Sequence, residues 1–276
     1  MHLAIQDTQD LNELKDKVIQ LLQEGTDINA QDIQKNTPLH YACRKGYAGV
    51  VRVLLENRAD PNMQNVDDRT PLHVVLLAAA AAKENKKEII KLLIEHNADV
   101  NIQDCLESSP LHYACDVADF FAVKSLLKKG ADINAKKFNN TPLHYLIAPT
   151  ASYASPVADN ETSCRGEILD FLIESQKCDL TVKYNDEQTY LHYAVQQSDI
   201  SLVQILLKTD IDIDWQNTDN KTALHCAIEA DTDADIKRKI VKLLAEKGAA
   251  VRKQYLNLAI KMNDVCIVQC LLDNYD

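Results

Sequence analysis

The stretch Thr37-Pro38-Leu39-His40-Tyr41-Ala42-Cys43 decides the fold, because its first four residues return along the chain. Successive copies begin 33, 39, 32, 48 and 33 residues apart. A period near 33 residues, lengthened twice by insertions, is typical of stacked helical repeats. The further copies are Thr70-Pro71-Leu72-His73, Ser109-Pro110-Leu111-His112, Thr141-Pro142-Leu143-His144, Thr189-Tyr190-Leu191-His192 and Thr222-Ala223-Leu224-His225.

The residues of one copy predict two helices and a turn. Thr37 suits a helix N-cap, where its hydroxyl accepts a hydrogen bond from a backbone N–H that has no helical partner. Pro38 suits the first helical position, where its missing N–H costs nothing. Val50, Val51, Leu54 and Leu55 then fall on one face of a second helix. An Ala-Asp-x-Asn sequence follows at 59–62, and it leads into a hairpin loop.

Weaker copies at both ends complete the array. Met1–Ile5 matches the stretch 39–43, and 256–260 followed by 267–272 matches one more helix pair. The sequence therefore predicts a single domain over residues 1–276. Its units are expected to cover residues 1–33, 34–66, 67–104, 105–137, 138–183, 184–217, 218–251 and 252–276.

The repeated Thr-Pro-Leu-His and Ala-Asp-x-Asn blocks closely resemble the ankyrin repeat, and the resemblance covers nearly the whole chain. It implies an all-α repeat solenoid of about eight stacked helix pairs with projecting β-hairpin loops. Such an array is curved and has a concave binding groove. The resemblance also implies that His40 forms a hydrogen bond to the neighbouring hairpin.

The chain departs from the family at the hairpin tips and at three insertions. The family's glycine, two residues before the threonine, is absent, so several tips are expected to be irregular. The insertion at 78–86 predicts a longer first helix or a helical bulge, and the one at 149–165 predicts a loop. A third insertion covers 231–239, and the last hairpin is shortened after Gly248. The tip residues are Lys35, Asp68, Glu107, Asn139, Glu187 and Asn220.

Composition excludes several functional classes. The net charge of −11 argues against nucleic-acid binding, which depends on Lys and Arg neutralising phosphates. The sequence has no apolar run long enough to span a membrane and no secretory signal at its start. Eight cysteines without a CxxC motif indicate free thiols in a reducing compartment. We therefore expect a cytoplasmic protein, or one in the host cytosol if it is a secreted effector.

The sequence contains no motif for catalysis, a cofactor or a metal. No phosphate loop, nucleophile elbow or metalloprotease motif is present. Six of the eight histidines end a repeat signature, which indicates a shared structural role. Cys266 and Cys270, four residues apart on a helix, could be two metal ligands, but no further ligands stand at zinc-like spacing. We expect a protein that is not an enzyme and needs no cofactor or metal.

Charge is unevenly distributed along the chain. Residues 178–235 carry twelve Asp or Glu and three Lys, which gives −9. This pattern predicts an acidic surface on the sixth and seventh units that faces a basic partner surface. The alternative is that these charges only keep the protein soluble.

The resemblance implies that a partner protein contacts the hairpin tips and the exposed residues of the first helices. Aromatic side chains at such tips are favoured interface anchors, although each ring could instead pack over the adjacent hairpin. Carried over by position, the partner-binding candidates are Arg44, Lys45, Leu106, Phe138, Tyr184, Asp186, Trp215, Asp219 and Glu229. The same positions include Ile33, Asp67, Arg69 and Gln196.

These features predict a protein–protein interaction scaffold. The excess of Lys over Arg (23 to 7) often accompanies AT-rich genomes. The degenerate repeats are similar to those of intracellular bacteria and large DNA viruses. Together these features suggest a host-directed effector or symbiont protein. The alternative is a substrate-recruitment or targeting module of a larger enzyme or ubiquitin-ligase adaptor. The helix at 265–272 is apolar on more than one side, so we expect a further segment, a partner or a second copy to cover it.

Overall fold

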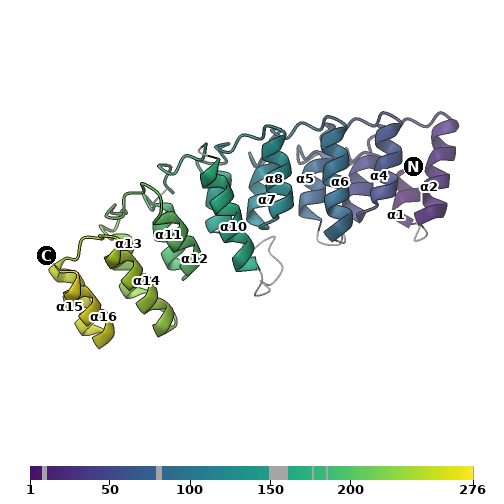
Figure 1. Ribbon diagram of the computed structural model, residues 1–276. Coiled ribbons are helices and arrows are strands. Elements are labelled where there is room, and N and C mark those ends of the chain that lie inside the picture. The colour runs from purple at the N-terminus through teal and green to yellow at the C-terminus, as the bar shows by residue number, and fades with distance from the viewer. Residues whose placement is uncertain (8–10, 79–82, 149–160, 176, 185, 276) are drawn as a thin grey trace. The chain divides into compact units, whose positions relative to one another are not determined.

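The computed structural model describes residues 1–7, 11–78, 83–148, 161–175, 177–184 and 186–275 (Figure 1). The chain forms two compact units, which divide between Phe138 and Asn139. Among the described residues, both units consist of helix pairs joined by turns, without β-strands. No helix in these ranges is long and apolar enough to cross a membrane.

The first unit contains four helix pairs in its described part. Its first helices pack against one another in chain order, and its second helices form a parallel row of their own. The pairs are α1 (His2–Asp7) with α2 (Leu11–Gln23), α3 (Pro38–Lys45) with α4 (Ala48–Glu56), α5 (Pro71–Leu77) with α6 (Lys83–Glu95), and α7 (Pro110–Asp116) with α8 (Phe120–Lys128).

The second unit repeats this arrangement with four more pairs in its described part. The expected all-α repeat solenoid of about eight helix pairs is therefore confirmed. That residues 1–276 form one domain stays a prediction, since each unit is compact on its own. The pairs are α9 (Pro142–Ile147) with α10 (Glu161–Glu174), α11 (Tyr190–Gln196) with α12 (Ile200–Leu206), α13 (Ala223–Glu229) with α14 (Ala234–Glu246), and α15 (Lys253–Lys261) with α16 (Val265–Asp273).

The repeated Thr-Pro-Leu-His block begins each first helix as the sequence predicts. Thr37 is extended and is the N-cap of α3, and its hydroxyl accepts from the His40 backbone N–H. The His40 ring reaches back, and its Nδ1 atom lies 3.1 Å from the Thr37 backbone nitrogen and 2.8 Å from the Thr37 hydroxyl. This reciprocal capping fixes the start of the helix and the orientation of the imidazole ring.

The other ring nitrogen of this histidine links successive pairs. The Nε2 atom of His40 lies 2.9 Å from the Arg69 carbonyl oxygen, and His192 makes the same contact with Lys221 at 3.0 Å. Since the carbonyl can only accept, Nε2 carries the proton, and since Nδ1 accepts from the Thr37 N–H, the His40 ring is neutral. Burial lowers the pKa of His40 to about 4. The predicted hydrogen bond to the neighbouring hairpin is confirmed here.

Three hairpin tips are regular, contrary to expectation, whereas at the tip of Asn139 two consecutive residues, Phe138 and Asn139, are left-handed. Lys35, Asp68 and Glu107 adopt φ values of 56°, 56° and 59°, the left-handed geometry that glycine usually supplies. An acidic or amide side chain stabilises each tip. For example, Asp32 Oδ1 accepts from two backbone N–H groups within its turn, at 2.9 and 2.8 Å. Neighbouring tips are also joined, since the Val66 N–H donates to the Gln34 carbonyl at 3.0 Å.

The insertions lengthen second helices, which corrects two predictions. The first helix α5 is not extended and ends at Leu77, whereas α6 begins at Lys83 and runs for 13 residues. The predicted loop at 149–165 is wrong for residues 161–165, which form the start of α10. Its remaining part, 149–160, lies outside the described residues. Most of the third insertion belongs to α14, which is capped by Asp233.

In α6 and α10, a largely buried cation joins the lengthened helix to the first helix of its pair. Lys86 of α6 donates to the Leu76 carbonyl at 2.9 Å, and Arg165 of α10 donates to the Leu146 carbonyl. Both cations satisfy a carbonyl at the end of the first helix of their own pair. In pairs without an insertion, the same repeat position holds an N-cap such as Asp119, which accepts from Ala122 N–H. In α6 and α10 a cation therefore stands where the shorter second helices have their N-cap residue.

Candidate protein-binding grooves

One groove lies in the first unit, where α3 and α5 face the hairpin between them. Val74 and Leu77 supply aliphatic surface, and Arg44 reaches in from the preceding pair. The Arg44 guanidinium lies 5.4 Å from the centroid of the Tyr41 ring and donates to Asn36 at 3.3 Å. The lining residues are Arg44, Asn65, Asp67, Arg69, Val74, Leu77 and Ala78.

The polar rim of this groove is held by a buried network. Arg69 Nε lies 3.4 Å from the carboxylate of Asp104, whose side chain is fully buried. Burial acts to raise the pKa of Asp104, but hydrogen bonds from Tyr113 and from two backbone amides outweigh it and lower the pKa. Asp104 is therefore a carboxylate at neutral pH, and it fixes Arg69 in place.

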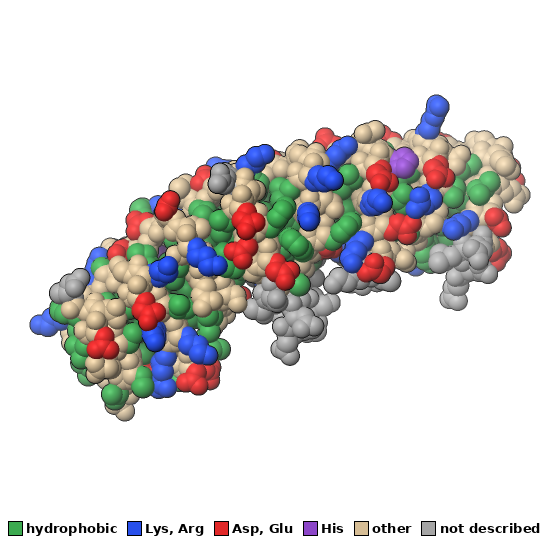
Figure 2. Space-filling view, viewed as in Figure 1, with side chains coloured by type: hydrophobic (Ala, Val, Ile, Leu, Met, Phe, Trp, Pro, Cys, Tyr) green, Lys and Arg blue, Asp and Glu red, His purple; other side chains and the backbone are tan. Residues whose placement is uncertain are grey.

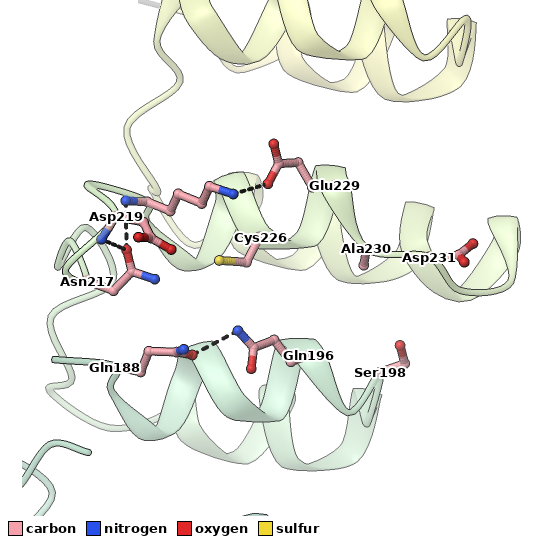
Figure 3. A pocket seen from close by; sticks show the side chains of 10 residues that line it. Gln188, Gln196, Ser198, Asn217, Asp219, Cys226, Glu229, Ala230 and Asp231 are labelled. Carbon is pink, nitrogen blue, oxygen red and sulfur yellow. Dashed lines mark hydrogen bonds and ion pairs between the residues drawn. The ribbon is translucent and has the colours of Figure 1, made fainter. Parts of the chain in front are cut away.

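A second groove lies in the second unit, between α11 and α13 (Figure 3). Gln188 and Gln196 form one wall, joined by a 2.8 Å hydrogen bond. Asp219 and Glu229 belong to the other wall, on the next hairpin and helix. The complete lining is Gln188, Gln196, Ser198, Asn217, Asp219, Lys221, Cys226, Glu229, Ala230 and Asp231.

Glu229 is the most connected acid of this second groove. It lies 2.6 Å from Lys221 Nζ and 3.3 Å from His225 Nε2. The hydrogen bond from Lys221 is the main reason that its pKa lies below the usual value. Both side chains of the Lys221–Glu229 pair remain more than a third exposed, so the pair contributes little to stability and can exchange partners.

The two grooves occupy the same position in the repeat. Counted from Thr70 and Thr222, Asn65 matches Asn217, and Arg69 matches Lys221. The groove is therefore a repeated feature with an altered lining. The remaining matches are Arg44 with Gln196, Asp67 with Asp219, Val74 with Cys226, Leu77 with Glu229, and Ala78 with Ala230.

The linings differ in charge and polarity. The groove of the first unit has two arginines, one aspartate and an aliphatic floor. The groove of the second unit has three acids (Asp219, Glu229 and Asp231), one lysine and an amide wall. The same site therefore presents a basic, apolar surface in one unit and an acidic, polar surface in the other.

The structure brings some of the predicted site residues together. Arg44 lines the groove of the first unit, and Asp219 and Glu229 line that of the second. Lys45 is exposed at the end of α3 but lines neither groove. Asp186 supports a hairpin, since it accepts from Gln188 Nε2 at 2.6 Å.

The four apolar candidates behave differently from one another. Leu106 and Phe138 are 40% and 59% exposed on their hairpins, outside the grooves. Tyr184 instead packs inside the second unit, where its ring stacks on Tyr193 at 3.7 Å and its hydroxyl donates to a backbone carbonyl. Trp215 is half-buried, and its Nε1 donates to the Glu187 carbonyl at 2.9 Å.

Sequence reasoning did not single out several groove residues. Leu77, Gln188, Asn217 and Lys221 all line the grooves. Their distance from the threonine of each repeat is the signal that could have identified them, because equivalent positions in a repeat share one environment.

The described His, Cys, Asp and Glu side chains are the candidates for metal ligands, and the thiols are the candidates for reactive groups. Within the described part of the chain, no three His, Cys, Asp or Glu side chains cluster as metal ligands would. All eight cysteines are free thiols. Burial raises the pKa of Cys226, the thiol in the second groove, to about 11, so it remains protonated at neutral pH.

Comparisons with known proteins agree with this architecture. A model of ankyrin repeats in many copies matches residues 21–75, and one of three ankyrin copies matches 76–148 and 158–255. The ankyrin repeat domain of Bcl-3, described as a unique member of the IκB family, is a similar structure, with a TM-score of 0.64 and 21% identity over 87% of this chain and 95% of that one.

The human ASB11 ankyrin repeat domain is also similar, with a TM-score of 0.62 and 22% identity over 86% of this chain and 98% of that one. At this level of identity the two structures establish the fold alone. No curated protein sequence matches the chain. Since the family models cover most of the sequence, the chain belongs to the ankyrin repeat family.

Proposed function

We propose that this protein is a non-enzymatic scaffold that binds a partner protein through the grooves between its first helices. The observation that carries the proposal is the equivalence of the two grooves, which recur at one position of the repeat with different linings. Ankyrin repeats generally mediate protein–protein interactions. A site repeated along an array can contact successive residues of an extended partner segment.

The acidic groove of the second unit favours a partner segment with Lys or Arg side chains. Asp219 and Asp231 are exposed and Glu229 is about a third exposed, so a cation can approach without a large desolvation cost. The acids of residues 178–235 surround this groove and would speed association with a basic surface.

The groove of the first unit favours an aliphatic side chain beside an acidic group. Val74 and Leu77 provide the apolar contact. Arg44 is exposed, and its contacts are a long 3.3 Å hydrogen bond to Asn36 and the face of the Tyr41 ring, so its guanidinium can turn to a carboxylate. Lys45 is exposed next to Arg44 and would add to this basic rim.

Photocross-linking tests where the partner binds. A benzophenone amino acid is placed at Gln196 or at Leu77, one in each groove, and the protein is irradiated in a lysate of candidate host cells. We expect one partner to be cross-linked from these positions. The matched controls carry the same group at Gln204 or Lys124, exposed on second helices and outside both grooves. Equal cross-linking of that partner from the control positions would rule out the grooves as its binding site.

Two biological settings fit such a scaffold. We favour a host-directed effector or symbiont protein acting in the cytoplasm, on the basis of the Lys-rich composition and the eight free thiols. The second candidate is a recruitment or targeting module of a larger enzyme or ubiquitin-ligase adaptor. The gene discriminates between them, because an open reading frame that continues into a catalytic or adaptor domain supports the second setting.

A further inference from the structure

The last helix pair keeps the apolar side chains with which other pairs bury their neighbours. Ile260 of α15 lies at the repeat position of Cys43 in α3 and Ile228 in α13, and both of those helices are packed against the next first helix. Cys43 and Ile228 are fully buried, whereas Ile260 is 61% exposed.

The second helix of this pair shows the same change. Val265 and Leu272 of α16 match Ala48 and Leu55 of α4. Ala48 and Leu55 are 7% and 3% exposed, but Val265 and Leu272 are 75% and 52% exposed. Figure 2 shows hydrophobic side chains reaching the surface at this end of the second unit. We name this surface the α15–α16 face, formed by Ile260, Val265, Val268 and Leu272.

At the opposite end of the array, polar side chains interrupt the corresponding surface. In α4, Gly49 lies against the preceding pair, because a Cβ there would collide with Lys15. Val50 and Val53 lie near Gly49 in α4. The residues at the equivalent repeat positions of α2 are Lys17 and Gln20, and both are exposed. Head-to-tail stacking of two copies would therefore bury an ammonium and an amide against aliphatic side chains, which is costly.

We propose that the α15–α16 face binds the same face of a second copy, which makes the protein a tail-to-tail dimer. A two-fold contact needs one self-complementary surface, and this face supplies aliphatic side chains to both sides. The exposed charges of α15 and α16 have both signs, with Lys253 and Lys261 against Asp273. Two such faces can therefore approach without the repulsion that the acidic stretch 178–235 would cause.

Sedimentation equilibrium of the full chain tests the dimer. We expect a mass approaching twice 31.0 kDa as the protein concentration rises. Ile260→Asp and Leu272→Glu should each weaken the dimer at least about tenfold, because they bury a charge at its centre. Both residues are more than half exposed in the single copy, so circular dichroism should show an unchanged fold. The control Ile33→Asp alters an equally apolar side chain, 94% exposed on a hairpin of the first unit, and should leave the dimer intact.

Thiol cross-linking reports the orientation independently. In a background in which the exposed thiols Cys105 and Cys266 are serine, Leu272→Cys places a thiol on the α15–α16 face itself, so a short bis-maleimide should join two copies through it. The matched control, Ile33→Cys in the same background, places a thiol on a hairpin of the first unit and should give no covalent dimer. A chain that stays monomeric at every concentration overturns the proposal. So does a dimer that survives both charge substitutions, or a covalent dimer that forms equally from the Ile33→Cys control.

Discussion

Tyr190 and Thr141 share a 2.9 Å hydrogen bond between their hydroxyl groups, across 49 residues of sequence. Tyr190 occupies the repeat position that proline fills in four other units. Tyr255 also stands at this position, and its hydroxyl lies 3.0 Å from that of Thr222. In the second unit, a tyrosine that replaces the proline therefore joins a helix pair to the threonine cap of the preceding pair.

The first prediction concerns this tyrosine link. Tyr190→Phe should lower the free energy of unfolding by about 1 kcal/mol, because the ring stays packed while the Thr141 hydroxyl loses one partner. Urea denaturation measures the change. Tyr275→Phe, at a 45% exposed ring near the end of the described chain, serves as the control and should have no effect. Equal stability of the Tyr190→Phe variant and the unmodified protein would show that the hydrogen bond contributes nothing.

The buried histidines predict loss of stability in acid. Burial lowers the pKa of both His40 and His73 to about 4, from an ordinary value of 6.5. The unfolded chain binds these protons below about pH 6.5, whereas the folded chain resists them until about pH 4. The contribution of these histidines to the free energy of unfolding is thus complete above pH 6.5 and is lost as pH falls toward 4. Each histidine should account for a loss of about 2 kcal/mol between pH 7 and pH 5.

Denaturation of the unmodified protein and of His40→Gln at both pH values checks this expectation. The glutamine does not titrate but keeps a donor to the Arg69 carbonyl, so the variant should lose less stability on acidification. Identical pH slopes for the two proteins would contradict a neutral, buried His40.

The buried cation of a lengthened helix should matter more than an exposed one. Lys86→Met should destabilise the protein by about 2 kcal/mol, since it leaves the Leu76 carbonyl buried without this donor. Lys91→Met in the same helix removes a lysine that is 68% exposed and should cost less than about 0.5 kcal/mol. Thermal denaturation compares the two variants, and equal effects would refute a special role for Lys86.

The hairpin tips predict a stabilising substitution. Lys35 has a φ of 56°, so Lys35→Gly should relieve backbone strain and raise the free energy of unfolding by about 1 kcal/mol. Lys35→Ala removes the same side chain without relieving the backbone and should give no gain. A glycine variant no more stable than the alanine variant would show that the tip is unstrained.

Most of the fold could be predicted from the sequence because the repeat unit is short and its signals are local. Thr37 and Pro38 define the start of a helix, and His40, the third residue of that helix, completes the cap. The left-handed tips were harder to predict, because the glycine was missing. In place of a glycine, a side chain such as Asp32 stabilises the turn, and it stands three residues before the tip residue Lys35.

Features that depend on the next repeat could not be predicted. Whether Tyr184 or Phe138 is exposed depends on neighbours a repeat away, and the two rings differ although both stand near hairpin tips. The insertion at 78–86 is rich in helix formers, but its sequence does not say which helix it extends. The buried contact of Lys86 with Leu76 favours the second helix, and only the packed structure reveals that contact.

The most direct test of the scaffold measures the affinity of the cross-linked partner for two double variants. Each variant replaces two acids with two lysines, so the change in net charge is the same. Asp219→Lys with Glu229→Lys reverses the acidic groove, whereas Glu167→Lys with Asp170→Lys reverses two exposed acids of α10. We expect the groove variant to bind at least about tenfold more weakly, mainly through slower association, and the α10 variant to bind as the unmodified protein does. Equal affinities of the two variants would contradict the account.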